Sequence, residues 1–130
     1  MKPKINFITL PVKSIELSKK FYQDTFEFPV SEQSNELCLF ELNDNFYFVI
    51  QKNTAFMNQI QNSDPDFISN SFILSHEAAS RNEVDAIVEK AEYNGAEKIK
   101  VLDEDWGYSV TIIDINKHHW EILYTYNNPA

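Results

Sequence analysis

The sequence predicts an α+β fold in which two similar halves share one core. Its 130 residues, 43% of them hydrophobic, suffice for one compact domain and are too few for two ordinary ones. The order strand, helix, then two or three strands occurs twice along the chain. Residues 6–10 also resemble residues 71–75, which lie 65 positions later, half the chain length. We therefore expect one domain, 1–130, of two modules at about 1–55 and 66–130.

In the first half, the pattern predicts a strand, a helix and a hairpin. Pro11 ends the strand because proline lacks the donor that a central ladder needs, and Ser14 caps the following helix. Apolar residues then recur at steps of four, as one buried helical face requires. The expected elements are a strand at 5–10, a helix at 15–26, and hairpin strands at 36–42 and 46–51 joined by the turn 43–45.

The second half repeats this order. Ser80 and Glu83 have the spacing of a capping box, and Asn94-Gly95 gives a left-handed stop to the helix between them. The expected strands lie at 70–75, 98–102, 108–115 and 119–126. Because neither half alone buries both a helix face and a sheet face well, we expect a curved, barrel-like mixed sheet around a small-ligand cavity.

Composition excludes several function classes. A formal net charge of -9 repels nucleic acid and anionic membrane surfaces, so a neutral or cationic partner fits better. Only two glycines occur, which excludes glycine-rich phosphate loops. The single cysteine, Cys38, cannot form an internal disulfide and indicates a reducing compartment. With no membrane-span pattern and no signal-peptide core, we expect a cytoplasmic protein.

Four segments carry a resemblance to the vicinal oxygen chelate superfamily of glyoxalase I, bleomycin-binding proteins and extradiol dioxygenases. Residues 12–22 (VKSIELSKKFY) are similar to its opening strand-to-helix signature, and 106–109 (WGYS) to its aromatic loop. Residues 114–122 (DINKHHWEI) resemble its terminal aspartate-proline-aspartate-glycine-histidine-x-tryptophan-glutamate hairpin, and 80–85 (SRNEVD) a helix start of the glyoxalase-like and bleomycin-resistance-like branches. The resemblance implies duplicated βαβββ modules, usually in a homodimer whose paired modules form ligand cavities.

The resemblance also implies where a metal would bind. Metal-dependent members place histidines and glutamates on the first and last strands of each module, and a divalent ion needs about three protein donors. Here the matching positions are Phe7, Phe48 and Phe72, which leaves Glu121 as the only donor. A slip of one residue swaps strand faces but still offers neither imidazole nor carboxylate. It would bring in Ile8, Ile73, Val49 or Tyr47. We therefore expect no metal and no cofactor.

The remaining histidines and the cysteine have structural interpretations. His119 shares a strand face with Glu121, whereas His118 shares the other with Trp120, and two donors on one face do not make a metal site. His76 is expected at the start of a loop. Cys38 shows no neighbouring base and is expected to be an inert, partly buried thiol.

A ligand-binding surface is predicted from aromatic and acidic residues. Trp106, beside Gly107, is a candidate pocket wall, whereas Trp120 is expected in the hairpin core. Glu121 would either meet a ligand's ammonium, amide or hydroxyl or accept bonds from backbone amides, and both interpretations stay open. The acidic run 103–105 would draw a basic ligand toward the cavity mouth. The predicted ligand-binding residues are Phe7, Phe48, Phe72, Trp106, Tyr108 and Glu121.

Three functions follow from these observations. The first is a metal-free homodimer that sequesters a small, partly aromatic, neutral or cationic molecule, so that we expect a binding protein rather than an active glyoxalase or dioxygenase. The alternative is a metal-dependent lyase, dioxygenase or thiol transferase, in which Gln51, Asn70 or His119 joins Glu121. The third is a protein whose useful surface is its dimer interface or a contact with another macromolecule.

Overall fold

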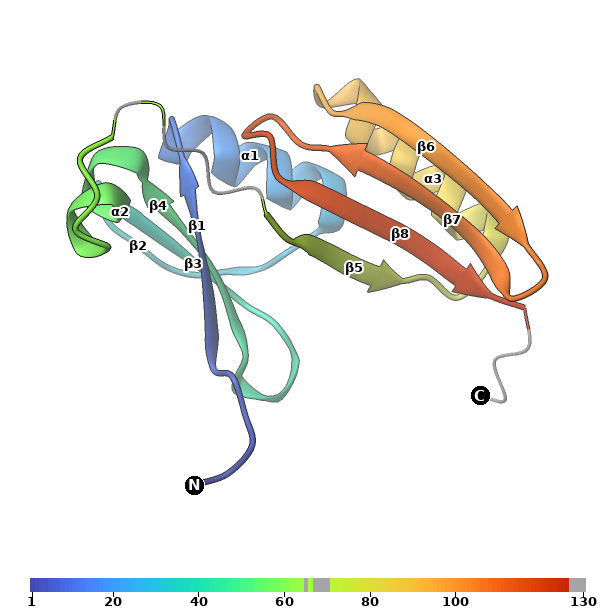
Figure 1. Cartoon of the computed structure of the whole chain (residues 1–130), viewed down its shortest axis with the longest axis horizontal. Helices are drawn as coiled ribbons and strands as arrows, with labels where there is room; N and C mark the ends of the chain where they lie inside the picture. The colour runs from blue at the N-terminus through green and yellow to red at the C-terminus, as the bar shows by residue number, and fades with distance from the viewer. Residues whose placement is uncertain (65, 67–70, 127–130) are drawn as a thin grey trace. The chain divides into compact units, whose positions relative to one another are not determined.

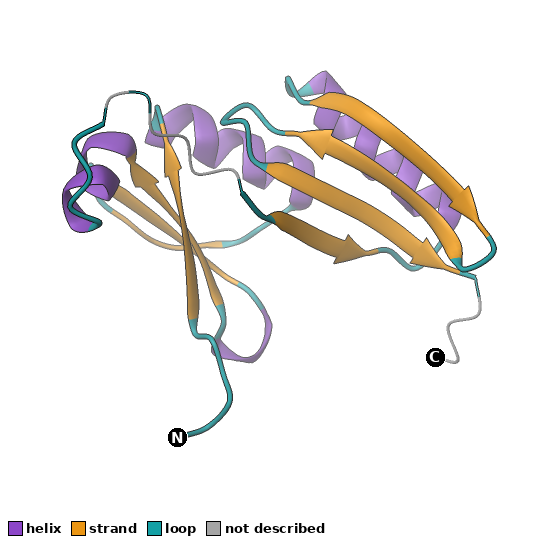
Figure 2. Cartoon of the chain, in the orientation of Figure 1, coloured by secondary structure: helices purple, strands orange, loops and turns teal. Residues whose placement is uncertain are grey.

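The computed structural model describes residues 1–64, 66 and 71–126 and divides into two compact units, Met1–Ser69 and Asn70–Ala130 (Figure 1). Each unit has a four-stranded mixed sheet with one long helix on one face (Figure 2). The expected α+β class is therefore confirmed. Among the described residues, each sheet is open, with two edge strands, so the expected barrel-like closure is not found within either unit.

The first unit has the strand order β1-β4-β3-β2, in which β1 and β4 are parallel and the other pairs antiparallel. Helix α1 covers one face of this sheet, and a short helix, α2, follows the last strand. The elements are β1 (Phe7–Val12), α1 (Ile15–Phe26), β2 (Val30–Gln33), β3 (Leu37–Glu41), the 3-10 turn η1 (Asn43–Asn45), β4 (Tyr47–Lys52) and α2 (Asn53–Gln59).

The second unit repeats this topology with the order β5-β8-β7-β6, in which β5 and β8 are the parallel pair. Helix α3 packs on β6, β7 and β8. The elements are β5 (Ile73–Glu77), α3 (Arg81–Tyr93), β6 (Glu97–Glu104), β7 (Gly107–Ile113) and β8 (His119–Thr125). The strand expected at 70–75 is observed as β5, which begins at Ile73 and continues to Glu77. Residue 70 lies outside the described residues.

The helix boundaries follow the predicted caps. The Ser14 hydroxyl accepts from the Leu17 amide at 3.2 Å, and the Ser80 hydroxyl accepts from the Glu83 amide at 3.1 Å. Gly95 adopts a φ of 109° after α3, as the predicted stop requires. Two elements were not predicted, β2 and α2, and both are short and lack a buried periodic stripe.

The core of the first unit is aromatic. Tyr22 of α1 is fully buried, and its ring lies 5.0 Å from that of Phe48 and 6.1 Å from that of Phe40. Both contacts are edge-to-face, a geometry that adds about 0.5–1.5 kcal/mol per pair beyond burial. Helix α1 therefore packs on its sheet mainly through contacts between aromatic rings.

The core of the second unit is mostly aliphatic. Trp120 is 4% exposed, which confirms its predicted place in the hairpin core, and its indole N–H donates to Asp114 at 3.0 Å. The Asp114 carboxylate also accepts from the amides of Asn116 and His118, and so closes the turn before β8. The buried aliphatic side chains are Val84, Val88 and Ala91 of α3 and Val110, Ile112 and Ile122 of the sheet. Among the described residues, no helix has the length and apolar character needed to cross a membrane.

Candidate ligand-binding site

Strand register decides which predicted site residues share a sheet face in the first unit. β1 pairs with β4 so that Phe7 lies beside Tyr47 and Ile8 beside Phe48. Because side chains alternate along a strand, Phe7 and Phe48 point to opposite faces. Phe48 contacts Tyr22 of α1, so the Phe48 face is the one that the helix covers. The face that carries Phe7 is called the open face of the first unit.

Phe48 is a core residue in this structure. It is 2% exposed, and its ring packs against those of Tyr22 and Phe28. The open face instead carries Tyr47, whose ring stacks on that of Phe7 at 5.3 Å with 19° between the planes. Phe7 is 54% exposed. In β4, therefore, the alternative alignment shifted by one residue is the observed one, with Tyr47 and Val49 on the open face in place of Phe48.

The same slip occurs in the second unit. Phe72 precedes β5, and its ring stacks against the imidazole of His118 at 6.3 Å. Ile73 begins β5 and pairs with His119, as Phe7 begins β1 and pairs with Tyr47. Ile73 is therefore the counterpart of Phe7, and the repeat between these strands is 66 residues rather than 65. By the same pairing, Val49 is the counterpart of Glu121.

Glu121 lies on the open face of the second unit, the face that α3 does not cover. It sits between Ser75 on β5 and Thr111 on β7. Its carboxylate accepts from the hydroxyl of Ser75 at 3.2 Å and from that of Ser109 at 3.0 Å. Ser109 is 1% exposed, so one partner of the carboxylate is buried. A carboxylate has about four acceptor positions, so capacity for a ligand's donors remains.

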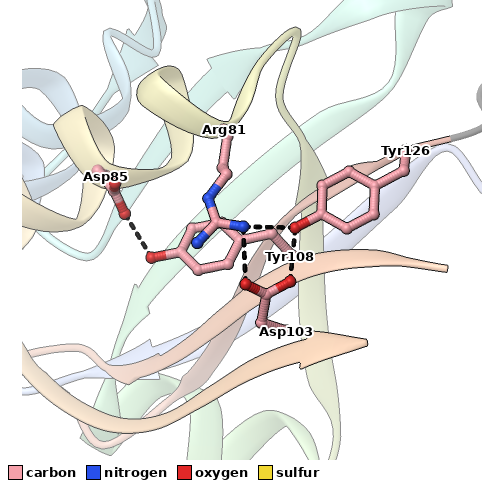
Figure 3. A network of polar contacts seen from close by, with 5 residues as sticks. All are labelled: Arg81, Asp85, Asp103, Tyr108 and Tyr126. Carbon is pink, nitrogen blue, oxygen red and sulfur yellow. Dashed lines mark hydrogen bonds and ion pairs between the residues drawn. The ribbon is translucent and has the colours of Figure 1, made fainter. Parts of the chain in front are cut away.

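Tyr108 lies on the helix-covered face of the second unit, where other groups occupy its ring and hydroxyl (Figure 3). The guanidinium of Arg81 lies 4.1 Å from its ring centroid, a cation–π contact. Its hydroxyl donates to Asp85 at 2.6 Å, and this hydrogen bond raises the pKa of Tyr108 above its ordinary value. A residue so engaged ties β7 to α3 rather than offering a stacking surface.

Arg81 also joins a polar network with Asp103 and Tyr126, as Figure 3 shows. Its guanidinium lies 2.7 Å from the Asp103 carboxylate, which also accepts from the Tyr126 hydroxyl at 2.6 Å. These bonds, that of Tyr126 first, hold the pKa of Asp103 below its ordinary value. Asp103 belongs to the acidic run expected at the cavity mouth, and here its charge is already paired within the unit.

Trp106 lies in the turn between β6 and β7 and is 42% exposed. The turn is fixed, because the Trp106 carbonyl accepts from the Tyr126 amide at 3.0 Å. Gly107 is required beside it, since a Cβ there would lie 2.3 Å from the Tyr124 carbonyl oxygen. Trp106 therefore remains accessible to a ligand, but it does not form one platform with the covered Tyr108.

The cysteine and histidines considered as nucleophiles or metal ligands do not form one cluster among the described residues. Cys38 is completely buried in the first unit, and burial raises the pKa of its thiol. His118 is buried at 2% exposure. His119 shares the open face with Glu121, as expected, and its Nδ1 has no hydrogen-bond partner in the part of the chain that the structure describes. Asn70 lies outside the described residues.

These donors do not fit a divalent metal ion. Within residues 1–64, 66 and 71–126, no group of three His, Cys, Asp or Glu side chains could hold one. Glu121 and His119 are two donors on one strand face, and the Glu121 carboxylate is engaged by both serines. A catalytic metal needs about three protein donors and an open position. We therefore derive no step through a metal.

Sequence reasoning missed the two serines and Arg81. Ser75 and Ser109 lie 46 and 12 positions from Glu121, so nothing local in the sequence signals that they bind one carboxylate. Arg81 follows the predicted cap residue Ser80, and only the sheet register brings Asp103 and Tyr126 to it.

Comparison with known families extends over nearly the whole chain. Residues 4–122 match the family model described as Glyoxalase/Bleomycin resistance protein/Dioxygenase superfamily. No curated protein matches the sequence.

Solved structures share the fold at low sequence identity. A glyoxalase-related enzyme from Fulvimarina pelagi superposes with a TM-score of 0.86 at 19% identity, covering 95% of this chain and 89% of the other. A glyoxalase/bleomycin resistance protein/dioxygenase family enzyme from Burkholderia phytofirmans gives 0.82 at 18% identity, covering 92% and 97%. The fosfomycin resistance protein FosX from Mesorhizobium loti gives 0.71 at 14% identity, covering 99% and 98%.

Proposed function

The chain belongs to the Glyoxalase/Bleomycin resistance protein/Dioxygenase superfamily. We propose that it binds a small molecule through its open-face residues without the help of a metal ion. The ligand is partly aromatic and neutral or cationic, and the function is sequestration. The observation that supports the proposal is the environment of Glu121. Two serine hydroxyls donate to its carboxylate, and the described residues around it include too few donors for a metal ion.

Each open face, taken by itself, offers one kind of contact to such a ligand. In the first unit, the stacked rings of Phe7 and Tyr47 offer an aromatic surface, which attracts flat groups and cations. In the second unit, Glu121 offers a charged acceptor whose position the serines fix before a ligand arrives, so that less ordering opposes binding. A net charge of -9 also favours the approach of cations over anions.

We further propose that the protein is a cytoplasmic homodimer. The family's usual assembly supports the dimer, and the single, buried cysteine supports the compartment. Size-exclusion chromatography with light scattering tests the dimer. A monomer at micromolar concentration would contradict it.

The experiment that tests the function is a thermal-shift screen in the presence of EDTA. The panel contains antibiotics, thiols and catechols, because binding to the folded state raises the apparent stability. We expect cationic, partly aromatic members to raise the melting temperature without added metal. A response that occurs only with a divalent ion would contradict the proposal.

Matched variants then locate the contact. Glu121→Gln keeps the size of the side chain and removes its charge, so a cationic ligand should bind about tenfold more weakly, equivalent to about 1.4 kcal/mol. Glu89→Gln on α3 is the control and should leave affinity unchanged. Equal affinity of both variants would remove Glu121 from the site.

The second candidate is a metal-dependent enzyme, which one observation favours. His119 lies on the same face as Glu121, and its Nδ1 has no partner among the described residues. Gln51 also lies on an open face, although in the first unit, and its amide is bonded to Gln59. If this candidate were right, Glu121→Ala would abolish both metal content and turnover.

A further inference from the structure

The first unit has an open hollow of about 530 Å³ beside the end of β4 and helix α2. Sites for small molecules measure about 300–1,000 Å³, so the hollow is large enough for one. All but one of its lining residues carry a hydrogen-bonding side chain. They are Glu36, Gln51, Thr54, Ala55, Asn58 and Gln59.

A buried amide with an unused hydrogen-bonding atom lines this hollow. Gln51 is 7% exposed, and its Nε2 donates to the Gln59 Oε1 at 3.0 Å. Its own Oε1 is buried and has no partner within the described residues. Turning the amide over exchanges the oxygen and nitrogen but still leaves one of them unpaired. Since an unsatisfied buried polar group is costly, this oxygen is available to a donor that enters the hollow.

The acidic residue of the hollow, Glu36, directly precedes β3 at the end of the sheet that carries Gln51. The Lys52 amide donates to the Glu36 carbonyl at 2.8 Å, directly after Gln51 in the chain. Gln51 also pairs with Leu37, the neighbour of Glu36. The backbone of Glu36 therefore lies at the same end of the sheet as Gln51, and Glu36 is one of the residues that line the hollow. Among the described residues that line it, none is a lysine or an arginine.

We propose that this hollow binds a small molecule bearing a guanidinium or amidinium group. Such a planar cation has several N–H donors, which match the carbonyl oxygens of the amides and the charge of Glu36. The described residues that line the hollow include no cationic side chain, which disfavours an anionic ligand. Gln51 is the buried anchor and Glu36 the counter-charge. The inference rests on the first unit alone and is independent of the function proposed at Glu121.

The test is an NMR titration of the full chain labelled with ¹⁵N, with methylguanidinium as the probe and N-methylurea as its neutral counterpart. We expect methylguanidinium to shift the side-chain amide signals of Gln51, Asn58 and Gln59 to saturation. Gln51→Leu should abolish the saturable shifts, while Gln23→Leu on the exposed surface of α1 should keep them. Glu36→Gln should weaken binding about fivefold.

Three results would overturn the proposal. Shifts that rise linearly without saturation would mean that no site exists. Saturable shifts retained in Gln51→Leu would place the probe elsewhere, and equal binding of N-methylurea would refute the cationic class. Should Gln51→Leu fail to fold, Asn58→Ala on the exposed face of α2 replaces it and should weaken binding. Unchanged binding in that variant would equally refute the site.

Discussion

The two units share one strand order but differ in both sheet faces. The helix-covered face of the first unit is built on aromatic rings, and that of the second on aliphatic side chains around Trp120. On the open faces, Val49 in the first unit stands where the second has Glu121. The two units therefore share their strand order, whereas the side chains on their open faces differ in chemistry. What the protein does must be argued from its open-face side chains, as the shared scaffold alone does not determine it.

The largest expected effect separates the two faces of the first sheet. Phe48→Ala should lower the free energy of unfolding by about 3–5 kcal/mol, because it opens a cavity in the aromatic core. Phe7→Ala, at a half-exposed position, should cost less than about 1 kcal/mol. Urea denaturation measures both. Equal losses would mean that the faces have been assigned incorrectly.

The second expected effect concerns the turn before β8, which positions Glu121 in the second unit. Asp114→Ala removes an acceptor of three hydrogen bonds and leaves the buried indole N–H of Trp120 unpaired. We expect a loss of about 2–4 kcal/mol in urea denaturation. Asp105→Ala, in an exposed turn, should change stability by less than about 0.5 kcal/mol. A small loss for Asp114 would show that the turn forms without its carboxylate.

The sequence predicts some elements and their buried faces better than others, depending on how regular the apolar pattern of each element is. The helices α1 and α3 are predictable because periodic apolar residues and serine caps agree. At the start of β4, residues 47–50 (YFVI) are apolar on both faces, so alternation does not fix which ring is buried. That ambiguity caused the one-residue slip at Phe48. Partners of Glu121 come from other strands, and no local pattern encodes them.

A third prediction uses pH to test the network that ties α3 to its sheet. Hydrogen bonds from Tyr126 and Arg81 lower the pKa of Asp103 in the folded state. Its stabilising effect is therefore complete above the unfolded-state pKa and is lost as pH falls through the folded-state value. The stability difference between the natural protein and Asp103→Asn should shrink from pH 6 to pH 3, measured by denaturation at each pH. A constant difference would contradict the network.

The smallest expected effect is a gain in stability from a substitution at Lys117, which lies in the same turn as Asp114. Lys117 has a φ of 71°, in the left-handed region that costs most residues with a side chain about 1–2 kcal/mol. Lys117→Gly should raise the free energy of unfolding by about 0.5 kcal/mol, since the added freedom of the unfolded chain offsets part of the relief. Thermal denaturation followed by circular dichroism measures it. A loss of stability would mean that the lysine side chain makes a contact of its own.

The most direct test of the central claim is metal content. The protein is dialysed against zinc, nickel, manganese and iron in turn, washed, and measured by elemental analysis beside Glu121→Ala. We expect no stoichiometric ion in either protein, because the described residues place too few donors beside Glu121 to hold one. A tightly held ion in the natural protein that disappears in Glu121→Ala would contradict the account.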